Sequence, residues 1–383
     1  MKIVIAPDSY KGSLTAKEVA HCMAVGLKRA LPDASYQETP VADGGDGTMT
    51  VLVDATGGQL IHADCHDPLG NPITAQYGIL GDGKTGVIEM ATANGLQFIT
   101  EQTAQPLSAS TYGTGELIKA ALAHGLKKIL LCLGGSATSD GGIGMAQALG
   151  IQFKNQQNSL VGHGNTAAGQ VASIDCSTLD PRVRQATFIL VSDVTNPLTG
   201  HTGASFTFGQ QKGANHTQQA MMDRNLHHFA QIVKKQLHRD FEMVSGAGAA
   251  GGLGFASMVF LGAKMQPGIT VVLNEINFAQ SVKDADFIIT GEGGTDEQTK
   301  YGKAPYGLAR AAKAIQPNCI VICLSGNVAA SSQSLYDQID VCLATVTGAK
   351  TLTAAIHSSR KDITQTAENI GRLIACLRPS SEA

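Results

Sequence analysis

The chain has 383 residues, and its 28 basic residues against 31 acidic ones give a formal net charge of −3. This length exceeds that of one ordinary domain and favours two, each with a sizeable buried core. Because the chain has no Trp, only 5% aromatic residues and no long basic run, it lacks the charge and the stacking side chains that a nucleic acid needs, and we expect no nucleic acid partner.

The N-terminal segment alternates strands and helices. Residues 2–6 form a continuous apolar run, typical of a buried strand, and residues 14–31 have the apolar spacing of a helix that Ser13 or Thr15 can cap. A second strand and a second helix are expected at 36–41 and 49–55. This order of strand, loop and helix predicts a parallel sheet with helices packed around it.

The middle of the chain has a different pattern. Between residues 57 and 96, short alternating stretches are separated by turn signals such as Pro-Leu-Gly-Asn-Pro, which predicts antiparallel strands. A domain boundary is therefore expected near residue 60. Beyond this segment, helices are expected at 115–124, 143–149 and 221–239, and buried strands at 128–133 and 186–191.

The C-terminal part again alternates strands and helices. Its strands are expected at 286–290, 319–324 and 341–344, and its helices at 305–314 and 352–377. Since this pattern matches the N-terminal segment and not the middle, we predict one α/β sheet domain built from both chain ends. The predicted division is residues 1–60 with 281–383, around an inserted mixed α/β domain at 61–280, with a cleft between the two domains.

Five loops that follow strands or short apolar runs share a composition of hydroxyl and acidic residues, in four cases with glycine. They are residues 7–13, 42–48, 134–142, 192–197 and 291–296. Ligands of open α/β sheets bind at the carboxyl ends of strands, and glycine, backbone amides and hydroxyls suit phosphate. Carboxylates would repel phosphate unless Mg²⁺ joined the two, so the set indicates phosphoryl transfer. Each loop by itself is also an ordinary turn.

Two familiar nucleotide motifs do not account for these loops. No Walker A sequence is present, because Gly302 and Lys303 are followed by Ala304. Residues 246–251 match the dinucleotide pattern G-x-G-x-x-G, but residues 241–244 before them make a poor strand. We interpret the match as a packing turn or a loop over nucleotide phosphates, and a nicotinamide-dependent hydroxy-acid dehydrogenase stays open as the alternative.

Taken in order, the motifs resemble those of the bacterial type-1 glycerate kinase family. The matching segments are residues 2–13, 41–48, 113–118, 134–142, 246–254 and 290–299. The resemblance implies ATP-dependent phosphorylation of D-glycerate at its 2-hydroxyl, giving 2-phosphoglycerate and ADP, with Mg²⁺. It also implies a flavodoxin-like α/β domain built from both chain ends and an inserted mixed domain.

The loops supply hypothetical site residues for this reaction. We assign catalytic roles to Lys11, Asp43 and Asp193, substrate binding to Asp8, Ser13 and Lys303, and Mg²⁺ binding to Asp193 and Asp296. Either Asp43 or Asp193 would accept the hydroxyl proton. The nucleotide phosphates are expected at Gly134, Gly135, Ser136, Thr138 and Asp140.

Two positions depart from the family's usual pattern. Gly294 stands where the family has Arg, so a guanidinium that could bind phosphate or carboxylate is missing, and Asp46 stands where Glu is usual. A non-catalytic sugar-acid binding protein is therefore a further alternative. The sequence leaves the oligomeric state open, with a homodimer as one candidate.

The termini and the cysteines bear on location. The first apolar run ends at Pro7 and is far shorter than that of a signal peptide, and no segment approaches the ~18 apolar residues that span a membrane. We therefore expect a cytoplasmic protein with no membrane partner. The eight cysteines include no C-x-x-C pair, and several lie in apolar runs, which predicts reduced core thiols.

Overall fold

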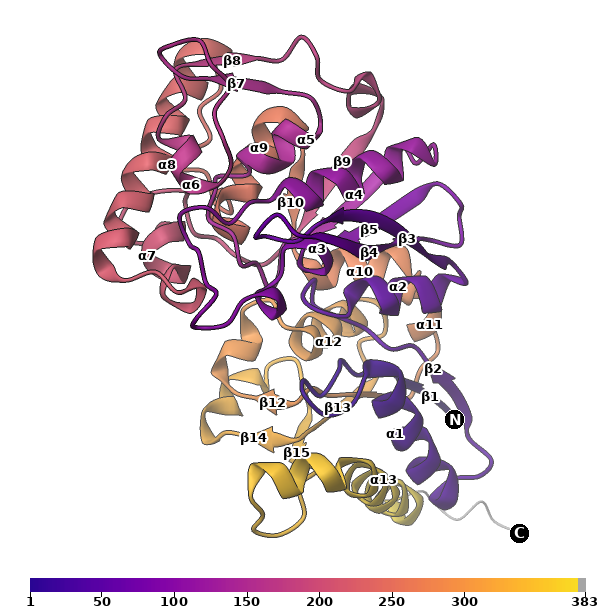
Figure 1. The fold of residues 1–383 in the computed structure, drawn as a ribbon. Helices are drawn as coiled ribbons and strands as arrows, with labels where there is room; N and C mark the ends of the chain where they lie inside the picture. The colour runs from indigo at the N-terminus through magenta and orange to yellow at the C-terminus, as the bar shows by residue number, and fades with distance from the viewer. Residues whose placement is uncertain (378–383) are drawn as a thin grey trace. The chain divides into compact units, whose positions relative to one another are not determined.

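The computed structural model describes residues 1–377, which form two compact units (Figure 1). The end unit comprises residues 1–43 and the C-terminal part from Gly268 onward, and the middle unit comprises residues 44–267. Each unit has its own hydrophobic core. The chain passes from the end unit to the middle unit between Asp43 and Gly44, within the second of the five loops.

The end unit is built on a five-stranded sheet in which every pairing is parallel. Its order is β15-β13-β11-β1-β2, which in chain order within the unit is 5-4-3-1-2. This is the strand order of the flavodoxin-like fold, and it confirms that prediction. The strands are β1 (Lys2–Ile5), β2 (Ser35–Glu38), β11 (Phe287–Thr290), β13 (Ile320–Ser325) and β15 (Val341–Ala344).

Two helices, α1 (Ala16–Ala30) and α13 (Leu352–Leu377), lie side by side on one face of this sheet (Figure 1). Thr15 begins α1 with a capping box, in which its hydroxyl accepts from the Glu18 N–H while the Glu18 carboxylate accepts from the Thr15 N–H. A Cβ at Gly26 would lie 2.2 Å from the Thr364 carbonyl oxygen, so the close approach of the two helices depends on this glycine.

The remaining elements of the end unit lie at its other face and its edge. Gly307 of one helix faces Ile269 of another so closely that a Cβ would lie 2.5 Å from the isoleucine side chain. These elements are α10 (Gly268–Glu275), α11 (Phe278–Val282), α12 (Ala304–Ile315), the paired strands β12 (Gly294–Thr295) and β14 (Asn327–Val328), and the 3₁₀ helices η5 (Glu297–Lys300) and η6 (Ala330–Leu335).

The middle unit is built on a six-stranded sheet of order β10-β9-β6-β5-β4-β3. The pairings from β10 to β5 are parallel and those from β5 to β3 are antiparallel, which confirms the mixed α/β prediction. The strands are β3 (Gln59–His66), β4 (Pro72–Ile79), β5 (Thr85–Glu89), β6 (Lys128–Cys132), β9 (Thr187–Val191) and β10 (Lys264–Gln266).

The core of the middle unit holds a cluster of edge-to-face aromatic rings. Phe229 packs against Phe153 and Phe255 with ring centroids 5.6 Å and 5.8 Å apart, and Phe260 joins them. The helices are α2 (Thr48–Thr56), α3 (Ala91–Asn94), α4 (Tyr112–Ala123), α5 (Ile143–Ala148), α6 (Gly164–Ala168), α7 (Ala204–Phe208), α8 (His216–Leu237) and α9 (Leu253–Phe260), with the 3₁₀ helices η1 (Leu96–Phe98), η2 (Pro181–Gln185), η3 (Gln210–Lys212) and η4 (Ala249–Gly252) and the paired strands β7 (Gln152–Lys154) and β8 (Ser173–Asp175).

The bounds of the two units differ from the predicted boundaries at residues 60 and 281. Helix α2 packs on β4 and β5, and a Cβ at Gly78 would lie 2.5 Å from the Val53 side chain, so residues 44–60 belong to the middle unit. Helices α10 and α11 pack on α12, so residues 268–280 belong to the end unit. These contacts join segments far apart in the sequence, and a local pattern does not reveal them.

All eight cysteines are free thiols, as predicted. Five of them are buried, whereas Cys176 and Cys342 are half-buried and Cys376 is exposed, so these three are not core thiols. Within residues 1–377, no helix has the length and apolar character that crossing a membrane requires.

Candidate active site

The carboxyl ends of the end unit's parallel strands bring two acidic residues together. Asp8 lies just beyond β1 and Glu292 just beyond β11, and these neighbouring strands are the point at which the strand order reverses. The Asp8 N–H donates to the Gly291 carbonyl oxygen at 2.9 Å. Ligands of doubly wound sheets bind in the crevice at this reversal, so the fold itself marks this edge as a candidate site.

Three loops pack closely at this edge. A Cβ at Gly293 would lie 3.4 Å from the Lys11 backbone nitrogen, and one at Gly326 would lie 2.5 Å from the Gly293 carbonyl oxygen. The Tyr10 hydroxyl donates to the Leu324 carbonyl oxygen at 2.7 Å. The loop that carries Lys11 and Asp8 is therefore fixed against the loops that follow β11 and β13.

Glu292, which the sequence-based assignment left out, is the centre of a polar network. One of its carboxylate oxygens accepts from the hydroxyls of Thr299 at 2.6 Å and Thr295 at 3.2 Å. Its other oxygen lies 3.4 Å from the Lys303 ammonium. The Ser325 hydroxyl, 2.7 Å from that of Thr295, also accepts from the Glu292 N–H at 3.3 Å. Lys303 is thus bound to a carboxylate at the predicted site.

The pKa values of two acidic groups at this edge, Asp8 and Glu292, are raised. Burial, followed by repulsion from Asp43 and from Glu292, raises the pKa of Asp8 to about 7. Burial also raises the pKa of Glu292, against the opposing effect of the Thr299 hydroxyl and Lys303. Perturbed carboxylates at a strand-end crevice are typical of functional sites. Among residues 1–377, however, no three His, Cys, Asp or Glu side chains are arranged to hold a metal ion.

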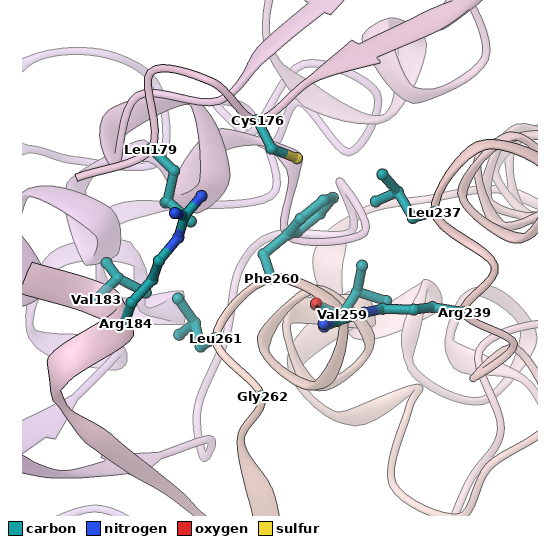
Figure 2. A pocket seen from close by; sticks show the side chains of 10 residues that line it. All are labelled: Cys176, Leu179, Val183, Arg184, Leu237, Arg239, Val259, Phe260, Leu261 and Gly262. Atoms are coloured by element: carbon teal, nitrogen blue, oxygen red, sulfur yellow. Dashed lines mark hydrogen bonds between the residues drawn. The ribbon is translucent and has the colours of Figure 1, made fainter. Parts of the chain in front are cut away.

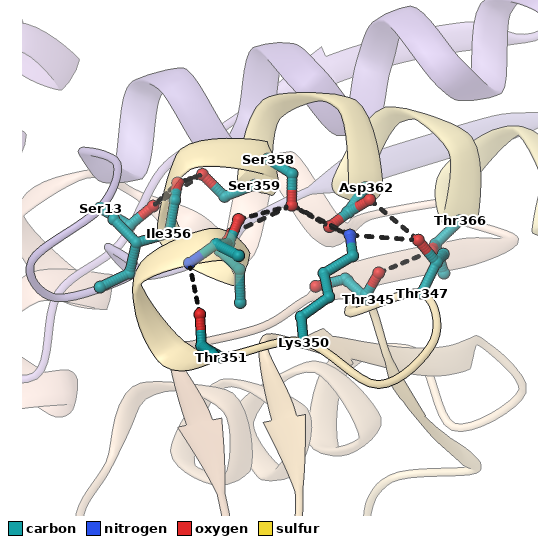
Figure 3. A network of polar contacts seen from close by, with 12 residues as sticks. Ser13, Thr345, Thr347, Lys350, Thr351, Ile356, Ser358, Ser359, Asp362 and Thr366 are labelled. Atoms are coloured by element: carbon teal, nitrogen blue, oxygen red, sulfur yellow. Dashed lines mark hydrogen bonds and ion pairs between the residues drawn. The ribbon is translucent and has the colours of Figure 1, made fainter.

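Ser13 and Asp296 both form hydrogen bonds within the end unit. The Ser13 hydroxyl lies 2.7 Å from that of Ser359 and 3.4 Å from the Ile356 carbonyl oxygen, so it joins the first loop to α13 (Figure 3). In the same network, Lys350 forms an ion pair with the buried Asp362. One oxygen of Asp296 accepts from the Gln298 N–H at 2.8 Å and caps η5.

In the middle unit, the other loops converge at the carboxyl ends of β6 and β9. The Gly141 N–H donates to the Gly251 carbonyl oxygen at 3.0 Å, and the Gly248 N–H donates to the Asn196 carbonyl oxygen at 3.0 Å. A Cβ at Gly135 would lie 2.9 Å from the Asp46 carboxylate. The segments 44–48, 134–142, 192–197 and 246–252 therefore lie against one another, as the loop hypothesis requires within this unit.

The five residues of the 134–142 loop that the sequence predicts to bind nucleotide divide into two kinds. Gly134 is half-buried and Gly135 is exposed, whereas Ser136, Thr138 and Asp140 are buried. Asp140 is fully buried, and its carboxylate accepts from three backbone N–H groups and from the Thr111 hydroxyl. Asp140 therefore holds the loop in shape from within. The half-buried Gly134 and the exposed Gly135 are the part of the loop that a ligand can reach.

A lysine that the sequence analysis did not select lies beneath this loop. Lys212, at the end of η3, is 1% exposed, and its ammonium donates to the Thr138 carbonyl oxygen at 2.6 Å and to the Ser136 hydroxyl at 2.9 Å. Burial lowers the pKa of Lys212 to about 7, against the opposing effect of Asp140. Its local sequence, Gln-Gln-Lys-Gly, carries no signal of burial, because lysines in such polar stretches are usually exposed.

Glu89, the last residue of β5, is a second residue that the sequence analysis did not select and whose pKa burial shifts. It accepts from the Met49 N–H at 2.8 Å in the first turn of α2. Burial, together with the nearby Asp46, raises the pKa of Glu89 to about 7, against the opposing effect of the Met49 N–H. The end of β5 thus adds a carboxylate to the converging loops, where the sequence pattern indicated only an ordinary strand.

The G-x-G-x-x-G match at 246–251 is a packing turn. Residues 242–248 form turns and bends, so the strand that a dinucleotide fold needs before the motif is replaced by a turn. A Cβ at Gly251 would lie 2.0 Å from the Thr138 carbonyl oxygen, and one at Gly248 would lie 2.2 Å from that of Pro197. The glycines allow α9 and its preceding turn to pack on the neighbouring loops.

A pocket of about 540 Å³ lies elsewhere in the middle unit (Figure 2). It is lined by the end of α9, the end of α8 and η2, and includes Arg184 and Arg239 beside apolar side chains. The lining residues Val183 and Gly262 precede β9 and β10, so the pocket opens at the amino ends of the strands. It contains none of the predicted site residues, and the candidate site does not include it.

Comparison with known proteins places the chain in a family. The model of the glycerate kinase family matches residues 3–375. A glycerate kinase from Bacillus subtilis is 45% identical over 98% of both chains, and the glycerate 2-kinase of Escherichia coli is 43% identical, again over 98% of both. A solved chain described as glycerate kinase 2 from Salmonella typhimurium LT2 has a TM-score of 0.89, with 40% identity and 98% coverage of both chains. The chain belongs to the glycerate kinase family.

Membership of the glycerate kinase family confirms the resemblance drawn from the six motifs. The family's motif is expected to have Arg where this chain has Gly294. A Cβ at Gly294 would have no neighbouring atom within 4 Å, so the backbone leaves room for a side chain. The Lys303 ammonium donates to the Gly294 carbonyl oxygen at 3.3 Å, so a cation still lies beside this position.

Proposed function

We propose that this protein transfers the γ-phosphoryl group of ATP to the 2-hydroxyl of D-glycerate, giving 2-phosphoglycerate and ADP. Full-length similarity to proteins named glycerate kinase, and in Escherichia coli glycerate 2-kinase, supports the substrate and the position. The observation that carries the proposal is the convergence of acidic, glycine-rich loops at the carboxyl ends of parallel strands in each unit.

The middle unit supplies the proposed nucleotide site. Gly134 and Gly135 follow β6 and precede α5, so their amides lie where phosphate binds in parallel α/β sheets. Ser136, Thr138 and Asp140 are buried, and we assign them to shaping the loop. Asp193, which follows β9 directly, is the proposed group at the reacting end of the nucleotide.

The end unit supplies the proposed glycerate site. Lys11, in the loop after β1, would bind the substrate carboxylate or the transferring phosphoryl group. Lys303 is held by Glu292 at 3.4 Å and would add a second cation. Asp8 would bind a glycerate hydroxyl, since a carboxyl group with a pKa of about 7 can either donate or accept a hydrogen bond near neutral pH. The Ser13 hydroxyl is hydrogen-bonded to α13, so Ser13 would support substrate binding by holding the loop after β1 in position.

The proton of the 2-hydroxyl needs an acceptor, for which Asp43 and Asp193 are the proposed candidates. The repulsion that Asp43 and Glu292 exert on Asp8 suits a site that receives a cation. Oxygen donors of this kind fit Mg²⁺, which Asp193 and the second oxygen of Asp296 would hold. When bound, Mg²⁺ would neutralise charge on the phosphates.

The test is a direct assay. Purified protein with ATP, Mg²⁺ and D-glycerate should release ADP, and ³¹P NMR should show 2-phosphoglycerate and not 3-phosphoglycerate. L-Glycerate in place of D-glycerate measures the enantiomer preference. Glycerate binding in calorimetry without ADP release would favour the non-catalytic alternative, and NADH binding would favour the dehydrogenase. A cytoplasmic location and a homodimer stay predictions of the sequence.

A further inference from the structure

The buried ammonium of Lys212 is the feature of the middle unit that the proposed function leaves unused. It approaches the 134–142 loop from η3, a segment between α7 and α8. Lys212 follows Thr138 by 74 residues in the sequence. Its two acceptors are both in the loop, the Ser136 hydroxyl and the Thr138 carbonyl oxygen. Lys212 is therefore placed to control how the loop presents its polar groups.

The loop's inner carbonyl groups are held away from its exposed glycines. Lys212 binds the Thr138 carbonyl oxygen at 2.6 Å, and the Asn165 side-chain amide binds that of Ser139 at 2.8 Å. A carbonyl oxygen turned toward a phosphate would repel it, so a loop that binds phosphate through its amides must turn its carbonyl oxygens elsewhere. Lys212 and Asn165 bind the carbonyl oxygens of two consecutive residues, Thr138 and Ser139, and so hold them in the interior.

The same region contains buried polar atoms without partners. Within the described residues, the hydroxyls of Thr138 and Ser139 are buried and form no hydrogen bond. An unsatisfied buried hydroxyl costs free energy, and in natural proteins it commonly marks a place that a ligand, ion or water completes. These hydroxyls flank the carbonyl group that Lys212 binds, which gives a second observation that a ligand belongs beside this loop.

The charge balance beneath the loop favours an anion. Asp140 is the titratable group whose charge acts on Lys212, and its carboxylate is already occupied by four donors. Among the ion pairs of the described residues, none involves Lys212. A buried ammonium without a bonded carboxylate is stabilised by any negative charge that binds above it.

We propose that Lys212 is a positioning residue of the nucleotide site. Its Nζ holds the Ser136–Thr138 segment in the phosphate-binding form of the loop, and the neutral amine takes up a proton from solvent and becomes an ammonium when nucleotide phosphates bind. The inference rests on the proposed role of the 134–142 loop as the nucleotide site. It follows from the geometry that Lys212 acts through the loop and does not need to touch the substrate. The pKa of about 7 in the free protein means that much of the ammonium is deprotonated above neutral pH.

The test uses the full-length protein with Mg²⁺ and ADP, in calorimetry at pH 6 and pH 8 in buffers of different ionisation enthalpy. Wild type should take up roughly one proton per ADP at pH 8 and much less at pH 6, because Lys212 is already charged at the lower pH. Lys212→Arg should still bind ADP but without this uptake, since a guanidinium stays protonated. Lys212→Met should weaken ADP binding by about tenfold to a hundredfold, the loss expected for charge-assisted hydrogen bonds. Lys235→Met, at an exposed lysine of α8, should bind as wild type does.

Equal proton uptake by wild type and Lys212→Arg would overturn the inference, as would a Lys212→Met affinity within twofold of wild type. If Lys212→Met fails to fold in a thermal melt, the comparison of wild type with Lys212→Arg decides alone. These measurements contain no glycerate, so a protein that shows the proton uptake but does not phosphorylate glycerate would contradict the proposed function and support the role of Lys212. Absence of ADP binding by wild type would overturn both the nucleotide site and the inference.

Discussion

At the scale of single residues, Asp8 makes the folded state sensitive to pH. Its pKa rises from 3.8 to about 7 on folding, so the folded protein retains this proton at pH values where the unfolded chain has lost it. Stability from this group is therefore fully present below about pH 4, falls as pH rises toward 7 and stays low above it. Because the ionised form of Asp8 is disfavoured in the folded protein above pH 7, we infer that this carboxyl group serves function and not stability.

We expect Asp8→Asn to stabilise the protein at pH 8 by on the order of 1–2 kcal/mol and to change little at pH 4. The reason is that the amide carries no charge to be buried away from water or to be repelled by Asp43 and Glu292. Thermal melts at both pH values, without Mg²⁺, measure this difference. Asp33→Asn, in the exposed turn before β2, is the control and should shift stability by less than ~0.5 kcal/mol at either pH. A larger gain at pH 4 than at pH 8 would contradict the sign.

Asp193 is the second residue at which a substitution is informative. Asp193→Asn should lower kcat by about two to four orders of magnitude while the melting temperature stays close to wild type, since the amide neither accepts a proton nor binds Mg²⁺ as strongly. A coupled assay of ADP release gives kcat. Asp64→Asn, on an exposed position of β3, is the control. Near wild-type turnover would remove Asp193 from the mechanism and leave Asp43 as the candidate base.

At the scale of elements, the turn before α9 and the 134–142 loop form one packed structure. Gly251 has a positive φ of 67°, and a Cβ there would lie 2.0 Å from the Thr138 carbonyl oxygen. Gly262, just after α9, has a φ of 64° but would have no atom within 4 Å of its Cβ. An alanine at either position would therefore bear the strain of a left-handed conformation. The two positions differ in whether the new Cβ would also contact the loop.

We expect Gly262→Ala to cost about 1 kcal/mol of stability, the strain of one left-handed alanine. Gly251→Ala should cost roughly 1–3 kcal/mol more, because overpacking adds to that strain, and should weaken ADP binding by displacing Thr138. Denaturant melts give the stabilities and calorimetry gives the affinities. Equal losses in the two variants would mean that the contact between the turn and the loop has no energetic consequence.

At the scale of the whole molecule, the two units differ in how the chain builds them. The middle unit uses one continuous segment, residues 44–267, with its own buried core. The end unit closes its sheet by placing β1 beside β11, which follows the whole middle unit in the chain. Closing a long loop costs entropy before any contact forms, so the end unit depends on the fold of the segment between its parts.

The fragment 44–267 should therefore fold alone. We expect a cooperative thermal transition and dispersed amide resonances in NMR, with ADP binding retained, because the loops at 134–142 and 246–252 and Lys212 all lie within it. A fragment of residues 1–43 joined directly to 268–383 tests the end unit in the same way. A middle fragment that stays unfolded would mean that its core needs the rest of the chain.

Much of the fold is determined by the sequence alone. Apolar runs and helical spacing gave β15 and α13 with their observed bounds, and the similarity of the two chain ends indicated a shared sheet. The motifs indicated the family, because glycine, acidic and hydroxyl residues recur in a fixed order after strands. Signals of this kind depend on neighbours in the chain, and periodicity reports them well.

Only the tertiary structure decided which side chains are exposed to a ligand and which support the site from within. Asp140 and Ser13 are in two of the five loops that the sequence marks, yet Asp140 is buried and Ser13 is hydrogen-bonded to α13. Lys212 is part of the candidate site because it binds the Thr138 carbonyl oxygen, which is far away in the sequence. Glu292 is part of the site because burial raises its pKa. Burial and long-range hydrogen bonds are properties of the packed chain, so a local pattern of residue types does not contain them.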